Sequence, residues 1–416
     1  MHFLYNIGIH LYSWAIYLAS PFHTKAWLFY TGRRRLFKRL QAAMTGEAPV
    51  VWFHCSSLGE FEQGRPLMEA YRQKCPEHAI LLTFFSPSGY EVCKDYAGAD
   101  WVFYLPLDTP RNARRLVGIV KPRTAIFIKY DFWYNILQAL QEQSIPTYVV
   151  SAIFRPTQLF FKCYGGFFRK MLRAYRQLFV QDYYSQELLQ SIGIVHVQVS
   201  VDTRFDRVWE LAQTPRQIPY IDIFLAGWPA LVAGSTWPAD EDKLAAAFAA
   251  LPNRVKLIIA PHEIHEEHIA SIERRFRPFG VVRYSALSDE TSPAAFLDKR
   301  TLILDTIGML SAVYRYGTVT YVGGGFSASG IHNTLEAAVY GLPVAFGPNY
   351  QRFREACDLI IQGGAVSYTT DKKLASILLN WFTDDEARHA AGHSNRQYVI
   401  DHCGATKTIL QAVVES

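Results

Sequence analysis

Paired cysteines of the kind that bind zinc or form a disulfide framework are missing from this sequence. The chain of 416 residues has six cysteines, and no two of them form a CxxC pair. Neither a structural metal site nor a disulfide-bonded secreted scaffold is therefore indicated, and a reducing compartment is expected. The cysteines are Cys55, Cys75, Cys93, Cys163, Cys357 and Cys403.

A strong charge of one sign is also missing. The net charge of +5 is too small for the basic stripe of a nucleic-acid-binding protein, so no nucleic acid partner is expected. Wholesale disorder is excluded as well, because 50% of the residues are hydrophobic and only 19% are charged. The length fits about two folded domains, and no internal repeat indicates a solenoid.

The N-terminal segment 3–22 contains no charged residue. As a helix it would be about 30 Å long, close to the thickness of a bilayer core. No Lys or Arg precedes it, which argues against a signal peptide, and the basic cluster that follows predicts a cytoplasmic location for the rest of the chain. Three interpretations stay open: a single span, a helix in the membrane interface, or a helix packed on the protein. The cluster, which suits anionic headgroups, comprises Lys25, Arg33, Arg34, Arg35, Lys38 and Arg39.

Beyond residue 48, short runs of β-branched and aromatic residues alternate with longer stretches such as 60–74 and 109–117, which are expected to be helical. This alternation is typical of parallel βαβ units. The predicted strands are 49–54, 80–85, 101–105, 124–129, 147–152, 178–181 and 196–199, and then 231–234, 255–260, 281–284, 302–305, 319–322 and 343–346.

The polar stretch 214–222, with two prolines, predicts a linker between two doubly wound α/β domains that face a cleft. We therefore expect a membrane-associated segment at 1–39, an N-terminal domain at 40–213, a C-terminal domain at 214–400 and a final segment at 401–416. Ligands of such folds bind beyond the carboxyl ends of the strands.

The motif VVWFHCSSLGEFEQGRP, residues 50–66, places a carboxylate near the end of a buried strand. The strand ends at His54, a loop of small residues follows, and Glu60 opens a helix. A glycosyl transfer needs a general base to take the proton of the attacking hydroxyl, and a positioned carboxylate can do this. The alternative is that Glu60 only stabilises its helix, since free N–H groups in a first turn favour an acidic residue.

Three successive glycines follow a later strand in residues 321–348, and they precede a predicted helix that ends near Gly341. Glycine lets the backbone approach a ligand closely, and a helix N-terminus suits a phosphate. The element therefore predicts a phosphate or nucleotide site, in which Glu336 would bind ribose hydroxyls. The alternative for Asn333 and Glu336 is a helix cap and its capping-box partner. The candidate donor contacts here are Gly323, Gly324, His332, Asn333 and Glu336.

Three more strands of the second half run into polar or glycine-containing loops, which converge in a doubly wound sheet. Their candidate ligand contacts are Ser235, Thr236, Pro261, His262 and Gly308. His262, His265 and His268 invite a metal interpretation, but HEIHEEH is not an HExxH motif, and a solvated polar helix is favoured. Arg204, after an earlier strand, suits either a departing phosphate or a surface salt bridge.

Taken in order, the motifs resemble those of the 3-deoxy-D-manno-octulosonic acid (Kdo) transferases of lipopolysaccharide biosynthesis. Any one motif is weak, but the ordered set is specific and covers nearly the whole chain. It consists of GR (32–33), SLGE (57–60), LLTFFSPSG (81–89), YLPLD (104–108), KPRTAIFIKYDFWYNIL (121–137), DTRFD (202–206), AGST (233–236), DTIGML (305–310) and GIHNTLEAA (330–338).

The resemblance implies a GT-B glycosyltransferase fold of two Rossmann-like domains, with a C-terminal helix that returns to the first. It implies Kdo transfer from CMP-Kdo to a lipid A precursor, at the cytoplasmic face of the cell inner membrane and in contact with its lipids. The reaction would invert the anomeric centre and need no metal or other cofactor.

The resemblance also implies roles for individual residues. Glu60 corresponds to the general base, and Arg204 falls where the family usually has a lysine. The CMP-binding loops correspond to Ser235, Pro261, Gly308, Asn333 and Glu336, and the acceptor side to Ser57, Gly59, Lys129 and Asp131.

Three positions depart from the family pattern. His262 stands where an arginine is usual, Lys129 and Asp131 replace the two glutamates of Glu-x-Glu-x-Trp-Pro, and Ile331 replaces a glycine. Two alternative functions also stay open. One is a GT-B transferase that uses a UDP-sugar on another lipid acceptor, and the other is a non-catalytic sugar-nucleotide-binding protein at the membrane.

Overall fold

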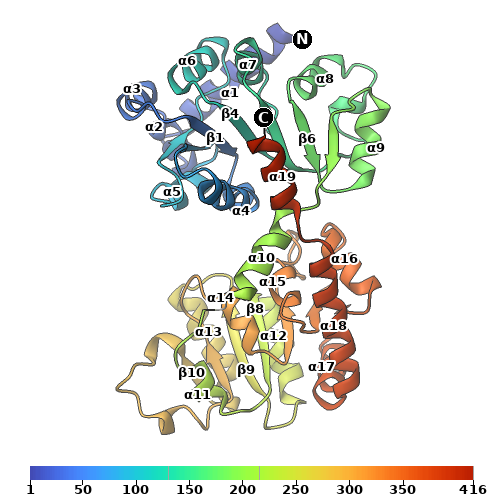
Figure 1. Ribbon diagram of the computed structural model, residues 1–416. Helices are drawn as coiled ribbons and strands as arrows, with labels where there is room; N and C mark the ends of the chain where they lie inside the picture. The colour runs from blue at the N-terminus through green and yellow to red at the C-terminus, as the bar shows by residue number, and fades with distance from the viewer. Residues whose placement is uncertain (130, 215, 416) are drawn as a thin grey trace. The chain divides into compact units, whose positions relative to one another are not determined.

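The structure, a computed structural model, describes residues 1–129, 131–214 and 216–415; Tyr130, Pro215 and Ser416 lie outside the described residues. The chain divides into two compact units. The first comprises Met1–Asp206 together with Gly404–Ser416, and the second comprises Arg207–Cys403. Each unit is built around a seven-stranded parallel sheet with helices on its faces (Figure 1).

The sheet of the first unit has the strand order β3-β2-β1-β4-β5-β6-β7. Its winding reverses between β1 and β4, which pair directly, with His54 opposite Phe127. The strands are β1 (Val50–Cys55), β2 (Ala79–Phe84), β3 (Trp101–Tyr104), β4 (Thr124–Ile128), β5 (Thr147–Ala152), β6 (Gln177–Val180) and β7 (Val197–Val199).

The helices of the first unit connect these strands, except for three that precede β1 and one at the C-terminus. They are α1 (His2–Ala19), α2 (Thr24–Gly32), α3 (Leu36–Ala43), α4 (Leu58–Lys74), α5 (Pro87–Cys93), α6 (Pro110–Val120), α7 (Tyr134–Glu142), η1 (Leu159–Phe161), α8 (Gly166–Arg173), α9 (Tyr183–Ser191) and α19 (Ala405–Val414), while α10 (Thr203–Gln213) runs across the division between the units.

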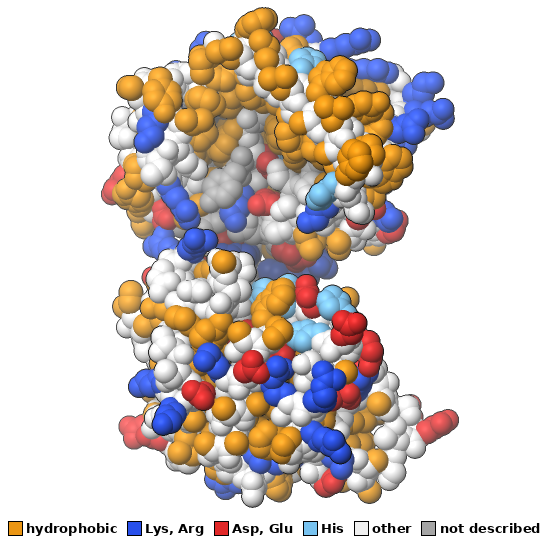
Figure 2. Space-filling view, turned by 180° about the vertical axis from the view of Figure 1, so that it is seen from behind, with side chains coloured by type: hydrophobic (Ala, Val, Ile, Leu, Met, Phe, Trp, Pro, Cys, Tyr) orange, Lys and Arg blue, Asp and Glu red, His pale blue; other side chains and the backbone are white. Residues whose placement is uncertain are grey.

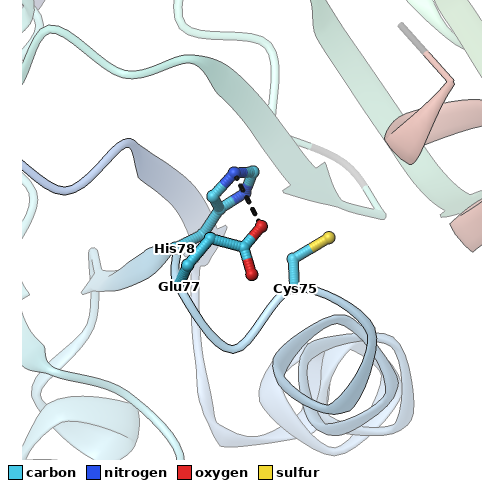
Figure 3. Close-up of side chains that lie close together, drawn as sticks. All are labelled: Cys75, Glu77 and His78. Atoms are coloured by element: carbon cyan, nitrogen blue, oxygen red, sulfur yellow. Dashed lines mark ion pairs between the residues drawn. The ribbon is translucent and has the colours of Figure 1, made fainter.

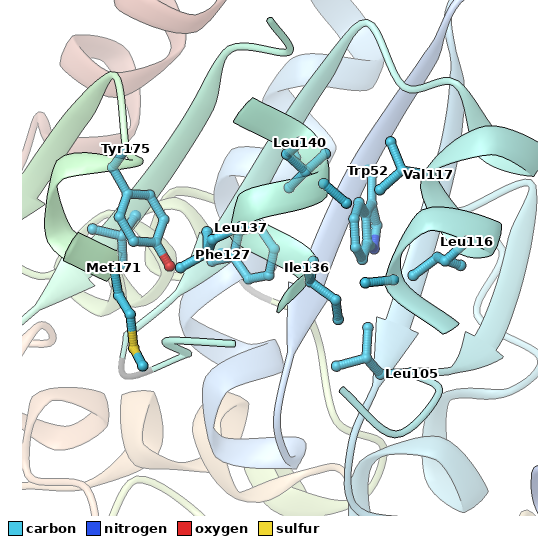
Figure 4. Close-up of a cluster of buried hydrophobic side chains, with 14 of the residues drawn as sticks. Trp52, Leu105, Leu116, Val117, Phe127, Ile136, Leu137, Leu140, Met171 and Tyr175 are labelled. Carbon is cyan, nitrogen blue, oxygen red and sulfur yellow. The ribbon is translucent and has the colours of Figure 1, made fainter. Parts of the chain in front are cut away.

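Both faces of this sheet are covered, which explains why its strands are hydrophobic throughout. On one face, Trp52 and Phe127 pack with Leu140 of α7 (Figure 4). On the other face, Phe53 belongs to a core that includes Ile409 of α19. Helices therefore cover both faces of the sheet. The loops that follow the carboxyl ends of its strands thus start from a well-packed core.

The sheet of the second unit has the order β10-β11-β9-β8-β12-β13-β14, and its winding reverses between β8 and β12. Its strands are β8 (Ala230–Thr236), β9 (Lys256–Pro261), β10 (Val281–Arg283), β11 (Thr301–Ile303), β12 (Val319–Val322), β13 (Val344–Phe346) and β14 (Ala365–Ser367). Its helices are α11 (Ile221–Leu225), α12 (Pro238–Ala249), α13 (Glu266–Phe276), η2 (Arg277–Phe279), η3 (Tyr284–Ala286), η4 (Pro293–Ala295), α14 (Leu310–Val313), η5 (Tyr314–Tyr316), α15 (Leu335–Ala338), α16 (Arg354–Ile361), α17 (Asp371–Thr383) and α18 (Asp385–Asp401).

The C-terminal helix α19 is joined to the first unit by Asp206. Its carboxylate accepts hydrogen bonds from the backbone N–H groups of Gly404 and Thr406, each at 2.6 Å. These bonds satisfy donors at a helix start that would otherwise lack partners. The structure divides the chain between residues 206 and 207, seven residues before the boundary expected from the prolines, because most of α10 lies in the second unit.

Arg33 does not belong to the lipid-facing basic cluster in which the sequence interpretation included it. Its guanidinium donates to the carbonyl oxygens of Leu105 (2.8 Å), Phe29 (3.0 Å) and Phe85 (2.7 Å). Burial lowers the pKa of Arg33 to about 9. The side chain therefore fastens α2 to the ends of β2 and β3, and the exposed basic residues of the segment are Lys25, Arg34, Arg35, Lys38 and Arg39.

Polar side chains of helix α1 are hydrogen-bonded to the rest of the first unit. The hydroxyl of Tyr5 donates to Asp108 (2.6 Å), and Asn135 contacts both His2 (3.3 Å) and Asn6 (2.9 Å). Over the described residues, no helix combines the length and the apolar character that crossing a membrane requires.

Candidate active site

Each sheet has a topological switch point, where the winding reverses and the loops after two neighbouring strands separate. In the first unit it lies between β1 and β4, and in the second between β8 and β12. Ligands of doubly wound sheets bind at such points. Most of the predicted site residues lie there: residues 57–60 after β1, Lys129 and Asp131 after β4, residues 235–236 at the end of β8 and residues 323–336 after β12.

Glu60 lies in the first turn of α4, where a neighbouring serine holds its half-buried carboxylate. The hydroxyl of Ser57 donates to Oε2 of Glu60. Ser57 is the N-cap residue of α4. Its hydroxyl is hydrogen-bonded to this carboxylate and not to a backbone N–H group of the described helix. The cap position thus orients the carboxylate, which can accept a proton from a hydroxyl group at the switch point.

Asp131, in the loop after β4, is a buried acidic neighbour of Glu60. The hydroxyl of Ser56 donates to Oδ1 of Asp131, and the hydroxyl of Tyr175 donates to its backbone carbonyl at 2.5 Å. Among the described residues, no group donates to Oδ2. Burial, together with repulsion from Glu60, raises the pKa of Asp131 to about 7. The two acidic side chains therefore interact, and the buried one holds its proton more tightly than an ordinary aspartate does.

His54, in β1, faces the carboxyl group of Asp131 but carries no charge to pair with it. Its Nε2 lies 3.6 Å from Oδ2 of Asp131 and accepts a hydrogen bond from Nε1 of Trp133 at 3.2 Å. Its Nδ1 is 2.8 Å from the hydroxyl of Thr83. Burial lowers the pKa of His54 to about 3, so the imidazole is neutral. A protonated Asp131 beside a neutral imidazole agrees with both shifts.

Replacing Asp131 with asparagine is expected to remove a pH dependence from the stability of the first unit. Because the pKa is about 7 in the folded state against an ordinary 3.8, the folded state binds the extra proton between these values. The stabilisation is therefore full below pH 3.8 and is lost as the pH rises through 7, with a slope of at most about 1.4 kcal/mol per pH unit. Urea unfolding near pH 5 and near pH 8 measures the effect.

The matched control is Asp95→Asn, which changes an exposed aspartate of the same unit. This variant should keep the wild-type loss of stability between the two pH values, while Asp131→Asn loses less. An Asp131→Asn protein whose free energy of unfolding declines as steeply as that of the wild type would contradict the assignment.

The other residues predicted for the site in the first unit are Lys129, Gly59 and Arg204. Lys129 follows β4 in a left-handed conformation with φ of 71°, and Gly59 is exposed on α4. Nε of Arg204 donates to the carboxylate of Asp202 at 2.9 Å, and this carboxylate also accepts from Gln63 of α4 at 3.0 Å. Arg204 thus forms a salt bridge, and its contact with a departing phosphate stays a prediction.

The glycine turn after β12 is buried, and it does not offer the free amides that the sequence interpretation expected. The N–H of Gly323 bonds the carbonyl of Gly234 (2.9 Å), and the N–H of Gly324 bonds the carboxylate of Asp240 (2.9 Å). A Cβ atom on Gly323 would overlap the backbone of Ser235. These glycines allow close packing of backbone segments, and their amides are not available to a phosphate.

The helix predicted after this turn is also shorter than expected. It was to run to Gly341, but α15 comprises only Leu335–Ala338. Oδ1 of Asn333 accepts from the N–H of Leu335 (3.1 Å), and its Nδ2 donates to Glu336 (3.0 Å). Asn333 and Glu336 therefore bond each other through their side chains, but the N-cap residue of α15 is Thr334, so the two do not form the expected capping box. So short a helix also provides no strong dipole for an anion.

Three aromatic rings, which we call the ring platform, meet at the switch point of the second unit. Nε1 of Trp237 donates to Nε2 of His332 at 3.0 Å. The ring of His262 stacks on both, with centroids 4.9 Å from Trp237 and 4.3 Å from His332. The platform joins the ends of β8 and β9 to the loop after β12, and the imidazole of His262 is exposed.

The remaining predicted donor contacts lie in neighbouring loops of the same unit. Ser235 has a left-handed backbone with φ of 53°, and the hydroxyl of Thr236 donates to Glu241 at 3.1 Å. Pro261 is the buried last residue of β9, while Gly308 is exposed in the loop after β11 with φ of 83°. All of them lie at or after the carboxyl ends of strands, as the predicted sheet required.

Comparison with known proteins gives relatives of one kind. Residues 33–207 match the sequence profile described as 3-Deoxy-D-manno-octulosonic-acid transferase (kdotransferase). The 3-deoxy-D-manno-octulosonic acid transferase of Bordetella pertussis is 27% identical over 384 residues, which cover 88% of this chain and 87% of that protein. The enzyme of the same name from Aquifex aeolicus is 26% identical over 320 residues, which cover 76% of this chain and 80% of that one.

The chain is a homologue of the Kdo transferases, to which it is similar over most of its length. It is therefore a glycosyltransferase, and the resemblance inferred from the ordered motifs is confirmed. The solved structure of UDP-GlcNAc 2-epimerase from Neisseria meningitidis, bound to UDP-GlcNAc, has a TM-score of 0.62 with 13% identity, and the match covers 88% of this chain and all of that one. This likeness supports the GT-B fold, with its two Rossmann-like units.

One cluster of the described residues has the geometry of metal ligands, and it lies away from the switch point of the first unit, to which it belongs. Cys75, Glu77 and His78 follow α4, and their ligand atoms lie within 4.8 Å of one another (Figure 3). The hydroxyl of Tyr71 is 2.7 Å from Nδ1 of His78, so part of this donor set is already bonded. The cluster precedes β2, at the opposite end of the sheet from Glu60.

The histidines singled out in the HEIHEEH motif have separate partners in this Kdo transferase homologue. His262 belongs to the ring platform, and His265 is 3.0 Å from the carboxylate of Glu263. Nε2 of His268 is 2.9 Å from the buried carboxylate of Glu241. The three imidazoles thus do not share a site.

Sequence reasoning missed three residues that organise the site. Ser56 connects Asp131 to the loop of Glu60, Trp237 supports the ring platform, and Asp240 bonds the N–H groups of both Trp237 (3.0 Å) and Gly324 (2.9 Å). A signal for Asp240 exists, because it lies three residues after the N-cap of α12, as in a capping box. The cap residue is a tryptophan and not the usual serine or threonine, so the sequence does not show the pattern.

Proposed function

We propose that this protein transfers Kdo from CMP-Kdo to a lipid A precursor at the cytoplasmic face of the cell inner membrane. The observation that carries the proposal is the carboxylate of Glu60, held by Ser57 at the switch point of a Kdo transferase homologue. The curated relatives are named for the same sugar, which supports Kdo as the transferred group.

In the proposed step, the carboxylate of Glu60 takes the proton of an acceptor hydroxyl as its oxygen attacks the anomeric carbon of the donor. A new carbon–oxygen bond forms to the acceptor, and the bond from the anomeric carbon to the phosphate oxygen breaks. CMP leaves with that electron pair, and the configuration at the anomeric carbon inverts. Asp131 and Ser56 hold the loop of Glu60 on the acceptor side.

The second unit supplies the donor site in this proposal. The ends of β8, β9 and β12 carry the ring platform and the half-buried pair of Asn333 and Glu336. Asn333 and Glu336 are suited to bind sugar hydroxyls, and His262 to contact the nucleotide. The switch point between β8 and β12 supports this location.

Helix α1 is the proposed contact with the membrane. Its polar residues bond the first unit, whereas an apolar stripe at helical spacing stays exposed. Such a helix suits the membrane interface, with its apolar side chains among the lipid tails. The stripe comprises Phe3, Leu4, Ile7, Leu11, Trp14 and Leu18.

The surface around α1 adds further apolar and basic groups. Figure 2 shows hydrophobic side chains spread over the first unit, with Lys and Arg side chains at its margin. Phe22 is 91% exposed, and Trp27 is 51% exposed. Lys25, Arg34 and Arg35 are exposed nearby in the sequence, and they suit the anionic headgroups of inner membrane lipids.

A donor comparison tests the proposal. The protein is incubated with a tetra-acylated lipid A precursor and either CMP-Kdo or a UDP-sugar, and products are identified by mass spectrometry. We expect a glycosylated lipid only with CMP-Kdo. Transfer from the UDP-sugar alone would identify the protein as a GT-B transferase of different donor specificity.

A further inference from the structure

A tight turn between α4 and β2 brings together three side chains of the kinds that bind transition metals. The turn has the sequence Cys75-Pro76-Glu77-His78, and the N–H of His78 donates to the carbonyl of Cys75 at 3.1 Å. Proline at the second position of a turn fixes the backbone there in advance. The sulfur of Cys75, a carboxylate oxygen of Glu77 and a ring nitrogen of His78 thus lie within 4.8 Å of one another (Figure 3).

The separations within this set of Cys75, Glu77 and His78, which we call the turn cluster, suit a tetrahedral zinc ion. Zn²⁺ binds sulfur at about 2.3 Å and nitrogen or carboxylate oxygen at about 2.0–2.2 Å, so two ligand atoms on one ion lie roughly 3–4 Å apart. Nε2 of His78 is already 3.4 Å from Oε1 of Glu77. The side chain of Glu77 is exposed, so it is free to rotate toward the ion.

The contacts of His78 leave one ring nitrogen for a ligand. The hydroxyl of Tyr71 is 2.7 Å from Nδ1, while Nε2 faces the carboxylate of Glu77. When the ring proton is on Nδ1, the lone pair of Nε2 points at a negative charge, and a cation between the two removes this repulsion. Histidines that bind metals usually donate their second ring N–H to a neighbouring group, as Nδ1 is placed to do here.

Tyr71 also lies beside the thiol of the turn cluster. Burial, with the neighbouring Cys75, raises the pKa of Tyr71, so its hydroxyl keeps its proton. That proton is available to the sulfur of Cys75 when the hydroxyl oxygen accepts from His78. One hydroxyl can therefore support two of the three ligands.

The charges around the turn cluster are compatible with a bound cation. Arg72, in the last turn of α4, donates to the carbonyl of His78 at 3.0 Å, and its guanidinium pairs with the carboxylate of Asp100. The positive charge of Arg72 is thus balanced by Asp100. The carboxylate of Glu77 and a thiolate at Cys75 together supply two negative charges, which match the charge of Zn²⁺.

We propose that the turn cluster is a zinc site, formed by Sγ of Cys75, a carboxylate oxygen of Glu77 and Nε2 of His78, with a water molecule in the fourth position. The thiol of Cys75 gives its proton to solvent when it binds the ion. The ion links the end of α4 to the start of β2 and stabilises the folded first unit. Because the turn contains a single cysteine, the spacing rules for paired zinc ligands do not detect it.

Titration of the full, reduced chain with Zn²⁺ tests the inference. The protein is first freed of metal with a chelator, and it then competes with a chromophoric zinc indicator. We expect one zinc ion per chain. Replacing a ligand, as in Cys75→Ser, Glu77→Gln or His78→Gln, should lower the zinc affinity by about 100-fold or more, and Tyr71→Phe should lower it by about 10-fold. Co²⁺ in place of Zn²⁺ should give a thiolate-to-metal charge-transfer band that Cys75→Ser abolishes.

Cys163→Ser is the matched control, because Cys163 is an exposed free cysteine of the same unit. This variant should keep the wild-type zinc affinity, and Zn²⁺ should raise its thermal unfolding midpoint as it does for the wild type. Glu77→Gln changes an exposed side chain, so it decides the question even if Cys75→Ser fails to fold. A wild type that binds less than one zinc per chain at saturation, or Glu77→Gln and His78→Gln proteins with wild-type affinity, would overturn the inference.

The zinc site is independent of the proposed glycosyl transfer. Glu60 lies in the first turn of α4, whereas the turn cluster follows its last turn. Kdo transfer by the metal-free protein, measured where that protein is folded, should therefore equal transfer by the zinc-bound protein. A rate that depends on zinc under those conditions would contradict a purely stabilising role for the ion.

Discussion

Replacing Glu60 with glutamine should lower the rate of Kdo transfer by about 10²–10⁴-fold, the range that a positioned general base contributes. Glutamine has nearly the same shape and can still bond Ser57, but it cannot accept the proton of the acceptor hydroxyl. CMP affinity should stay at the wild-type value, since the proposed donor contacts belong to the second unit. Initial rates with CMP-Kdo, together with CMP titration, measure both quantities.

Glu62→Gln is the matched control, because Glu62 is an exposed glutamate on the same helix. Its rate should stay close to the wild-type rate. Ser57→Ala, which removes the hydroxyl that orients Glu60, should lower the rate by less than Glu60→Gln. Near-normal turnover by Glu60→Gln would reject the assigned role of this carboxylate.

Placing charges on the apolar stripe of α1 should release the protein from membranes. Leu11 and Trp14 are each 64% exposed, and burial of such a side chain in an apolar environment contributes about 1.5–3 kcal/mol. Leu11→Glu combined with Trp14→Glu should therefore weaken binding to vesicles that contain anionic lipid by about 100-fold or more. Cosedimentation of the protein with such vesicles measures the change.

Val195→Glu is the control for this experiment, because Val195 is 77% exposed on the same unit but lies far from α1 in the sequence. This variant should bind vesicles as the wild type does. Circular dichroism checks that the doubly charged variant is folded. Vesicle binding that survives the double substitution would mean that α1 does not hold the protein at the membrane.

Much of the fold could be predicted from hydrophobic runs. The strands expected at 147–152 and 319–322 are confirmed as β5 and β12, and the other predicted strands lie within two residues of the observed ends. Buried parallel strands give continuous apolar runs, which explains this agreement. β14 was not predicted because its three residues directly follow two glycines, which indicate a turn.

The site was harder to predict because its geometry depends on contacts between distant segments. The sequence indicated Glu60 and Asp131, yet only the pairing of β1 with β4 brings their loops together. Arg33 was misassigned because a run of basic residues does not reveal that one of them turns inward to three carbonyl groups. Gly323 and Gly324 were predicted as donor contacts, and a sequence does not reveal that their N–H groups have partners within the protein.

The most direct test of the account is mass spectrometry of the lipid product formed by the wild type and by Glu60→Gln from CMP-Kdo and a tetra-acylated lipid A precursor. We expect a Kdo-bearing lipid from the wild type and almost none from the variant in the same time. Equal product from both proteins, or no Kdo-bearing lipid from the wild type, would contradict it.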